Sequence, residues 1–167
     1  MKRAFSAITE YLLLFMLAAF LGWLYEIGCV YVMFHHYQAR GVLHLPMCPI
    51  YGFGILLLLG IFRERKNIFL LFFGSALIAT AIELASSYAI EYFLHESLWT
   101  YENWPLQFQG RISGVSSAMF GLLATLFLRL VRPPVGKLFR SRARMVAAVF
   151  TAALAVFCVA WELRFRL

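Results

Sequence analysis

Residues 68–94 read IFLLFFGSALIATAIELASSYAIEYFL, an apolar run whose charged side chains are Glu83 and Glu91 alone. A helix needs about 20 consecutive apolar residues to cross the hydrocarbon core of a bilayer. An ionised carboxylate in that core costs at least about 2.5–3.5 kcal/mol, so it is expected to face the protein interior. The run therefore predicts a membrane-spanning helix that carries a sheltered polar site.

The composition of the whole chain is that of an integral membrane protein. Of its 167 residues, 63% are hydrophobic and 14% are charged, against about 45–50% and about 25% in a soluble domain. The net charge of +7 does not indicate nucleic-acid binding, because the basic residues lie between apolar runs. We predict one integral membrane domain over residues 1–167.

Other apolar runs are also long enough to span the bilayer: Tyr11–Phe34, Ser113–Leu130 and Met145–Leu163. A further run follows Pro49 and ends near Phe62, which gives only about 21 Å of helix against about 30 Å of hydrocarbon. Because Pro46 and Pro49 interrupt a longer helix, we expect a discontinuous second span with residues 42–48 as its entry.

The predicted fold class is all-α, a polytopic transmembrane helical bundle of about five spans. The segment His95–Ile112 is rich in aromatic residues, which suits an interfacial or re-entrant loop before the fourth span. The fourth span is expected to end before Pro133. We predict two core helix–loop–helix units, about 11–62 and 68–131, that form a parallel repeat, with an accessory fifth span at about 145–163.

Lysine and arginine residues predict the orientation. With the N-terminus inside, eleven of them fall on the cytoplasmic side and four on the outer side, as the positive-inside rule requires. The C-terminus is then expected outside. The basic run Arg129–Arg144 is interpreted as a topology signal and a contact for anionic lipid.

Glu83, Ser87 and Glu91 are spaced to form one polar row on a helix, and Glu26 lies in the first span. The functional interpretation is a buried site, open to the outside, for a substrate or a proton. The structural alternative is a set of ion pairs with Arg40 and Arg111. The two are equally favoured for Glu26 and Glu83, and the structural one is favoured for Glu91.

Arg40 and Arg111 each precede a candidate helix N-terminus, where free N–H groups attract anions. Peptide groups near Tyr51, Gly52 and Gly54, and those near Ser113 and Gly114, are candidate ligand contacts, since glycine permits close approach of the backbone. The alternative, that both arginines simply neutralise glutamates, remains open. Trp99 and Tyr101 are interpreted as part of an aromatic belt, with a stacking pocket as the alternative.

No metal or cofactor is expected. The histidines match no standard zinc spacing, and the chain contains neither an aspartate nor a GxxxxGK[ST] motif. The last absence argues that the chain does not hydrolyse ATP by itself.

A set of short stretches is recognisable as a group: Gly22-Trp23-Leu24-Tyr25-Glu26, Arg40-Gly41, Cys48-Pro49-Ile50-Tyr51-Gly52-Phe53-Gly54, Glu83, Ser87-Tyr88, Glu91, Trp99, Tyr101, Pro105 and Gly110-Arg111-Ile112. Over roughly Leu21–Phe120 the chain resembles the bacterial membrane family described as "putative ABC-transporter type IV" permeases. The resemblance implies a permease in a bacterial cytoplasmic (inner) membrane. The chain departs from the family pattern in the second loop, at Thr100, Gln107, Gln109 and Ser113.

We therefore predict a small permease-like or solute-binding membrane subunit. Its expected partners are the lipid bilayer, a small polar or amphipathic ligand, and either a second copy or a partner membrane or ATPase subunit. Two alternatives remain. One is a membrane-embedded enzyme that acts on a lipid or amphipathic substrate from the outer leaflet, and the other is a structural or regulatory membrane subunit. An enzymatic role is the less favoured of these expectations, and no catalytic residue is assigned.

Overall fold

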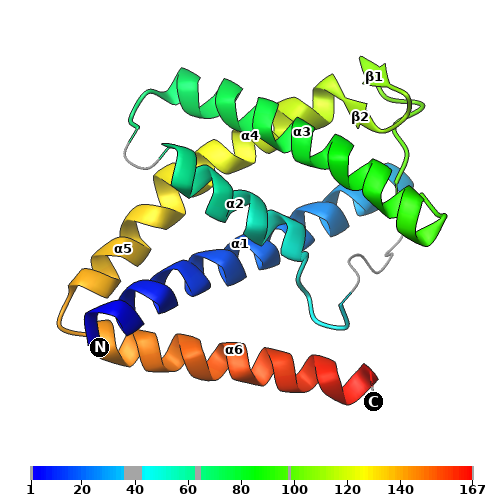
Figure 1. Cartoon of the computed structure of the whole chain (residues 1–167). Coiled ribbons are helices and arrows are strands. Elements are labelled where there is room, and N and C mark those ends of the chain that lie inside the picture. Colours follow the sequence, from blue (N-terminus) through cyan, green and yellow to red (C-terminus); the bar gives the residue numbers. More distant parts are fainter. Residues whose placement is uncertain (1, 36–42, 63–64, 98, 167) are drawn as a thin grey trace. The chain divides into compact units, whose positions relative to one another are not determined.

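The computed structural model describes residues 2–35, 43–62, 65–97 and 99–166. Figure 1 shows the elements, which are helices apart from one short hairpin. Their bounds are α1 (Lys2–Phe34), α2 (Pro49–Phe62), α3 (Ile68–Leu94), β1 (Gln107–Phe108), β2 (Ile112–Ser113), α4 (Gly114–Leu126), η1 (Phe127–Val131), α5 (Arg132–Arg140) and α6 (Arg144–Arg166).

The predicted all-α membrane fold is confirmed. Within the described ranges, four helical segments are long and apolar enough to cross a membrane: Lys2–Val32, Ile68–Leu94, Gly114–Arg140 and Arg144–Phe165. The helix α2 has 14 residues and is shorter than these. It begins at Pro49 and ends at Phe62, as expected for the interrupted second span.

Two boundaries differ from expectation. The helix α1 begins at Lys2, not at Tyr11. The fourth helical segment does not end before Pro133, because η1 has π-helical geometry and leads directly into α5. Proline is tolerated in the first turn of a helix, where its missing N–H would have no intrahelical acceptor. The π-helical turn of η1 and the first turn of α5, which accommodates Pro133, together let the helical segment continue past this residue.

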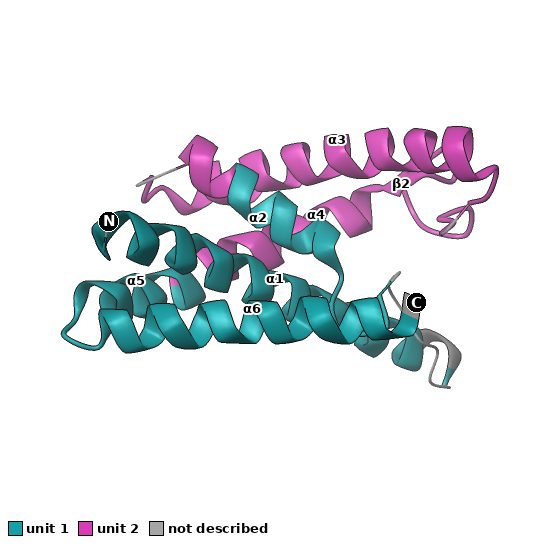
Figure 2. Cartoon of the chain, turned by 60° about the horizontal axis from the view of Figure 1, so that its bottom comes forward, with its two compact units in different colours: residues 1–57, 130–167 teal, residues 58–129 magenta. Residues whose placement is uncertain are grey.

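The chain divides into two compact units, which Figure 2 colours separately. Unit 1 is Met1–Leu57 with Leu130–Leu167. In this unit α1 packs against α5 and α6, and α5 packs against α6. The backbone N–H of Cys48, just before α2, donates a 3.0 Å hydrogen bond to the carbonyl of Ala19 in α1.

Unit 2 is Leu58–Arg129, and the packing of α3 against α4 dominates it. Gly121 of α4 allows close approach: a Cβ there would lie 2.8 Å from the Phe72 carbonyl oxygen and 2.9 Å from the Ala76 Cβ. The Thr80 hydroxyl also donates a 2.6 Å hydrogen bond to Ser117 Oγ. Small residues and hydroxyl bonds of this kind are typical of helix contacts inside membranes.

The segment between α3 and α4 contains a small antiparallel hairpin, β1–β2. The Arg111 N–H donates a 3.0 Å hydrogen bond to the Phe108 carbonyl. The two residues between them, Gln109 and Gly110, have φ angles of 53° and 66°, the pattern of a type I′ turn. Ser113 then caps α4, and its side chain accepts hydrogen bonds from the backbone N–H groups of Val115 and Ser116. This local chemistry fixes the position of Arg111.

Candidate functional site

The polar row on α3 lies in unit 2. Glu83 and Ser87 are buried, with 7% and 8% of their surfaces exposed. The Glu91 side chain, two turns further on, is 53% exposed. The predicted i, i+4, i+8 spacing therefore produces a row that runs from a buried carboxylate to an exposed one.

Glu83 accepts hydrogen bonds from hydroxyl groups. The Tyr101 hydroxyl donates to its Oε1 over 2.6 Å, and the Ser116 hydroxyl lies 3.5 Å from its Oε2. Tyr101 is itself held by a 2.7 Å hydrogen bond from its N–H to the Gly110 carbonyl, and its ring packs edge-to-face on Trp104. A buried carboxylate is tolerated where such donors replace water.

Arg111 spans the outer part of the row. Its Nη1 donates a 2.9 Å hydrogen bond to Ser87 Oγ, and its Nη2 forms an ion pair with Glu91. The guanidinium carbon lies 4.2 Å from the centre of the Tyr88 ring, a cation–π contact. The planar guanidinium thus contacts three residues on two successive turns of α3.

Two further contacts hold the loop that carries Arg111. The Trp99 indole N–H donates a 3.1 Å hydrogen bond to the Arg111 carbonyl, and the Tyr88 hydroxyl hydrogen-bonds Gln109 Oε1. In this position Trp99 acts as a brace for the backbone of the loop. Unit 2 therefore joins Glu83, Ser87, Glu91, Trp99, Tyr101 and Arg111, six of the predicted site residues, in one network.

The remaining predicted residues belong to unit 1. The Tyr51 hydroxyl hydrogen-bonds the Glu26 carboxylate, and Cys48 Sγ lies 3.7 Å from Glu26 Oε2. Gly52 lies against Phe15 of α1, since a Cβ on Gly52 would be 2.5 Å from Phe15 Cδ2. Arg40, the expected partner of Glu26, falls outside the described residues.

The packing of α2 on α1 explains one of the sequence motifs. A Cβ on Gly22 would lie 2.2 Å from Tyr51 Cγ. Gly22 therefore leaves room for the ring whose hydroxyl reaches Glu26, one turn further along α1. The spacing of Gly22 and Glu26 in one motif with Tyr51 in the other thus has a direct structural cause.

Several participating residues were not among the predicted site residues: Cys48, Tyr88, Gln109 and Ser116. A signal for Ser116 exists, because Ser113 and Ser116 have the spacing of a helix capping box. Tyr88 and Gln109 have no comparable signal, since their contact depends on the path of the loop.

Glu162 of unit 1 accepts a 2.9 Å hydrogen bond from the His44 N–H, lies 3.3 Å from His44 Nδ1, and is 13% exposed. Within the described part of the chain, no three His, Cys, Asp or Glu side chains gather in a way that could hold a metal ion.

These membrane-length helices and the polar network between α3 and its neighbouring loop define a multi-pass helical membrane protein. The chain belongs to the family described as "Putative ABC-transporter type IV", whose model matches residues 13–162. The resemblance noted in the sequence is thereby confirmed, and it makes this a membrane protein of transport-related nature. Searches of curated proteins and of solved structures find no match.

Proposed function

We propose that the protein is a permease-like or solute-binding membrane subunit, with its ligand site in the polar network of unit 2. The observation that carries the proposal is the graded row from buried Glu83 to half-exposed Glu91, with Arg111 bound to Ser87 and Glu91 in its outer part. Charged groups of both signs inside a membrane protein are costly and typically mark a functional pathway.

The exposed end of the row is suited to ligand exchange. An ion pair that is accessible to water contributes only about 0–1 kcal/mol, and Glu91 is 53% exposed in its pair with Arg111. An anionic group on a ligand can therefore replace Glu91 at the guanidinium at little cost. The guanidinium fork then binds that group through two N–H donors.

The buried end supplies the complementary charge. Glu83 lies one turn before Ser87 on the same face of α3, and the hydroxyl groups of Tyr101 and Ser116 contact its carboxylate. A small polar or amphipathic ligand with an anionic group at Arg111 and a cationic or hydrogen-donating group toward Glu83 matches this arrangement. Trp99 and Tyr101 contribute aromatic surface beside the site.

The proposal includes a second polar group, in unit 1. The Glu26 carboxylate and the Tyr51 hydroxyl form this group, and we propose Arg40 and Gly52 of the family motif as further ligand contacts. We further propose a bacterial inner-membrane location, as the family resemblance implies, with the N-terminus inside and the C-terminus outside, as the basic residues predict. We also propose that the protein acts as a homodimer or with a partner membrane or ATPase subunit.

The experiment is purification from the native membrane followed by mass spectrometry of co-purified small molecules. Wild type is compared with Arg111→Gln, and with Arg164→Gln as an exposed arginine outside the network. We expect a polar compound to accompany wild type and Arg164→Gln, to be depleted at least tenfold in Arg111→Gln, and to cross proteoliposomes that contain wild type.

Other outcomes would reject the proposal. Chemical conversion of the compound in the absence of a gradient would indicate the enzyme. If Arg111→Gln and Glu83→Gln lose folding and assembly while no compound accompanies the wild type, the subunit is structural.

A further inference from the structure

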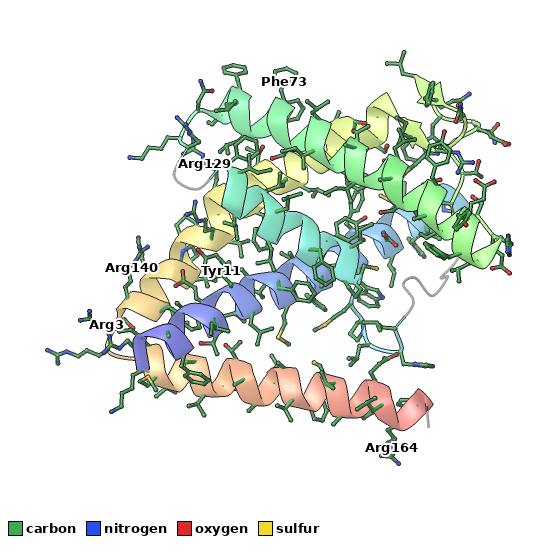
Figure 3. All side chains as sticks on the ribbon, viewed as in Figure 1. Arg3, Tyr11, Phe73, Arg129, Arg140 and Arg164 are labelled. Carbon is green, nitrogen blue, oxygen red and sulfur yellow. The ribbon has the colours of Figure 1, made fainter. Side chains whose placement is uncertain are left out.

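Unit 1 contains a separate polar pocket at the end that carries the N-terminus of α1. The pocket has a volume of about 160 Å³ and is lined by α1, α5 and the start of α6. Its lining residues are Arg3, Ser6, Ala7, Glu10, Phe139 and Arg144. Figure 3 shows Arg3 and Arg140 at this end of the unit and Arg164 at the opposite end of α6.

The charge of the pocket is positive. Arg3 and Arg144 are both exposed and contribute a guanidinium each. The lining also contains one acid, Glu10. A third guanidinium lies near it, because a Cβ on Gly136 would be 2.9 Å from Arg140 Nη2 and 3.4 Å from Glu10 Oε1. Two guanidinium groups against one carboxylate leave the lining with an excess of positive charge, which favours an external anion.

The pocket lies where two membrane-length helical segments begin. Lys2–Val32 carries Arg3 and Ser6 in its first two turns, and Arg144–Phe165 begins at Arg144. The end of a membrane-spanning helix lies at the headgroup region of the bilayer. A basic pocket at this depth matches a phospholipid, whose headgroup is anionic and whose acyl chains are apolar.

We propose that this pocket binds the phosphate headgroup of an anionic phospholipid whose acyl chains lie in the bilayer beside it. Arg3 and Arg144 pair with the phosphate, and guanidinium groups form strong hydrogen bonds to phosphate oxygens. The buried Phe139 forms the apolar wall of the pocket, and the buried Ser6 lies at its edge. A bound lipid would stabilise the packing of α1 against α5 and α6, because only the folded chain forms the pocket.

The test uses the full-length protein in detergent and native mass spectrometry. Phosphatidylglycerol is the anionic probe and phosphatidylcholine the zwitterionic control. We expect phosphatidylglycerol to bind wild type at least tenfold more tightly than phosphatidylcholine. The double variant Arg3→Gln/Arg144→Gln is expected to lower phosphatidylglycerol affinity by roughly 25-fold, at about fivefold per removed charge.

The matched control is Arg142→Gln. Arg142 is an exposed arginine in the turn between α5 and α6, and it does not line the pocket. It should change the affinity less than twofold. Equal losses in Arg142→Gln and the double variant would mean diffuse attraction and would overturn the proposal. Competition by soluble glycerol 3-phosphate as effective as that by the lipid would assign the pocket to a free phosphate compound and also overturn it.

A folding defect in the double variant does not remove the test. The single variant Arg3→Gln changes one exposed side chain near the helix end, where substitutions are usually tolerated. Its expected loss is about fivefold. Unchanged phosphatidylglycerol affinity in folded Arg3→Gln would reject the site.

Discussion

The Tyr101 hydroxyl donates a 2.6 Å hydrogen bond to Glu83 Oε1, and so ties the loop before α4 to the buried carboxylate of α3. The two residues are 18 positions apart in the chain. Glu83 is 7% exposed, and removing a buried carboxylate from water is costly unless donors replace the water. The loop therefore contributes directly to the stability of α3 as well as to the proposed site.

Replacing Tyr101 with Phe should destabilise unit 2. The change deletes one hydroxyl and keeps the ring against Trp104. A hydrogen bond to a charged group contributes about 1.5–3 kcal/mol, and we expect a loss of that size in denaturant unfolding followed by circular dichroism. Tyr92→Phe is the control, because Tyr92 is 76% exposed on α3, the helix that carries Glu83. Equal effects of the two variants would contradict the role of the Tyr101 bond.

Arg111→Lys should loosen the loop although it keeps the charge. A lysine ammonium lacks the planar fork that contacts Ser87 and Glu91 and stacks on Tyr88. We expect amide hydrogen exchange over residues 99–113 to accelerate about tenfold or more, in line with a loss of about 1.5 kcal/mol or more. Arg65→Lys, an exposed arginine in unit 2, should leave the exchange unchanged. Full protection in Arg111→Lys would show that charge alone holds the loop.

Gly121→Ala should force α3 and α4 apart. The added Cβ would meet the Phe72 carbonyl oxygen at 2.8 Å, and backbone cannot rotate away as a side chain can. Overpacking of this kind costs about 1–3 kcal/mol. Gly60→Ala is the control, since no heavy atom lies within 4 Å of its Cβ position, and it should be neutral or stabilising by up to about 1 kcal/mol. Thermal unfolding of both variants in the same detergent measures the difference.

Gly22→Ala should displace the Tyr51 ring, because its Cβ would lie 2.2 Å from Tyr51 Cγ. We expect a loss of about 1–3 kcal/mol and a weakened Tyr51–Glu26 contact. Gly28→Ala tests the same substitution in the same helix α1 with no heavy atom within 4 Å of the new Cβ. Tyrosine fluorescence and thermal unfolding distinguish the two. A Gly22→Ala variant as stable as Gly28→Ala would refute the close packing of α1 and α2.

The proposed orientation can be checked with single cysteines in a background that lacks Cys29, Cys48 and Cys158. Asn103→Cys lies in the loop before α4, and Ala143→Cys lies in the turn between α5 and α6. In intact cells a membrane-impermeant maleimide should label Asn103→Cys, whereas Ala143→Cys should require permeabilisation. The reverse pattern would invert the topology predicted from the basic residues.

Much of the fold could be predicted from the sequence. The run Ile68–Leu94 coincides with α3, and the short helix after Pro49 ends at Phe62 as expected. These boundaries are readable because hydrocarbon requires long apolar helices, and because proline and charged residues end them locally. The end of the fourth segment could not be predicted in this way, since a π turn allows the helix to continue past Pro133.

The site was predictable only in part. Helical spacing placed Glu83, Ser87 and Glu91 on one face, and the structure agrees with that row. The spacing could not show that a type I′ turn at Gln109–Gly110 would place Arg111 against Ser87 and Glu91. It also could not show that Ser116, 33 residues from Glu83, would reach the same carboxylate.

The sequence by itself determined that the chain is helical, that it belongs in a membrane and that α3 carries a polar row. Each of those properties follows from the local cost of placing a residue type in hydrocarbon. Only the tertiary structure decided the hydroxyl donors to Glu83, the ion pair of Arg111 with Glu91 and the basic pocket of unit 1. Those contacts join residues far apart in the chain, and packing and turn geometry, not local preference, bring them together.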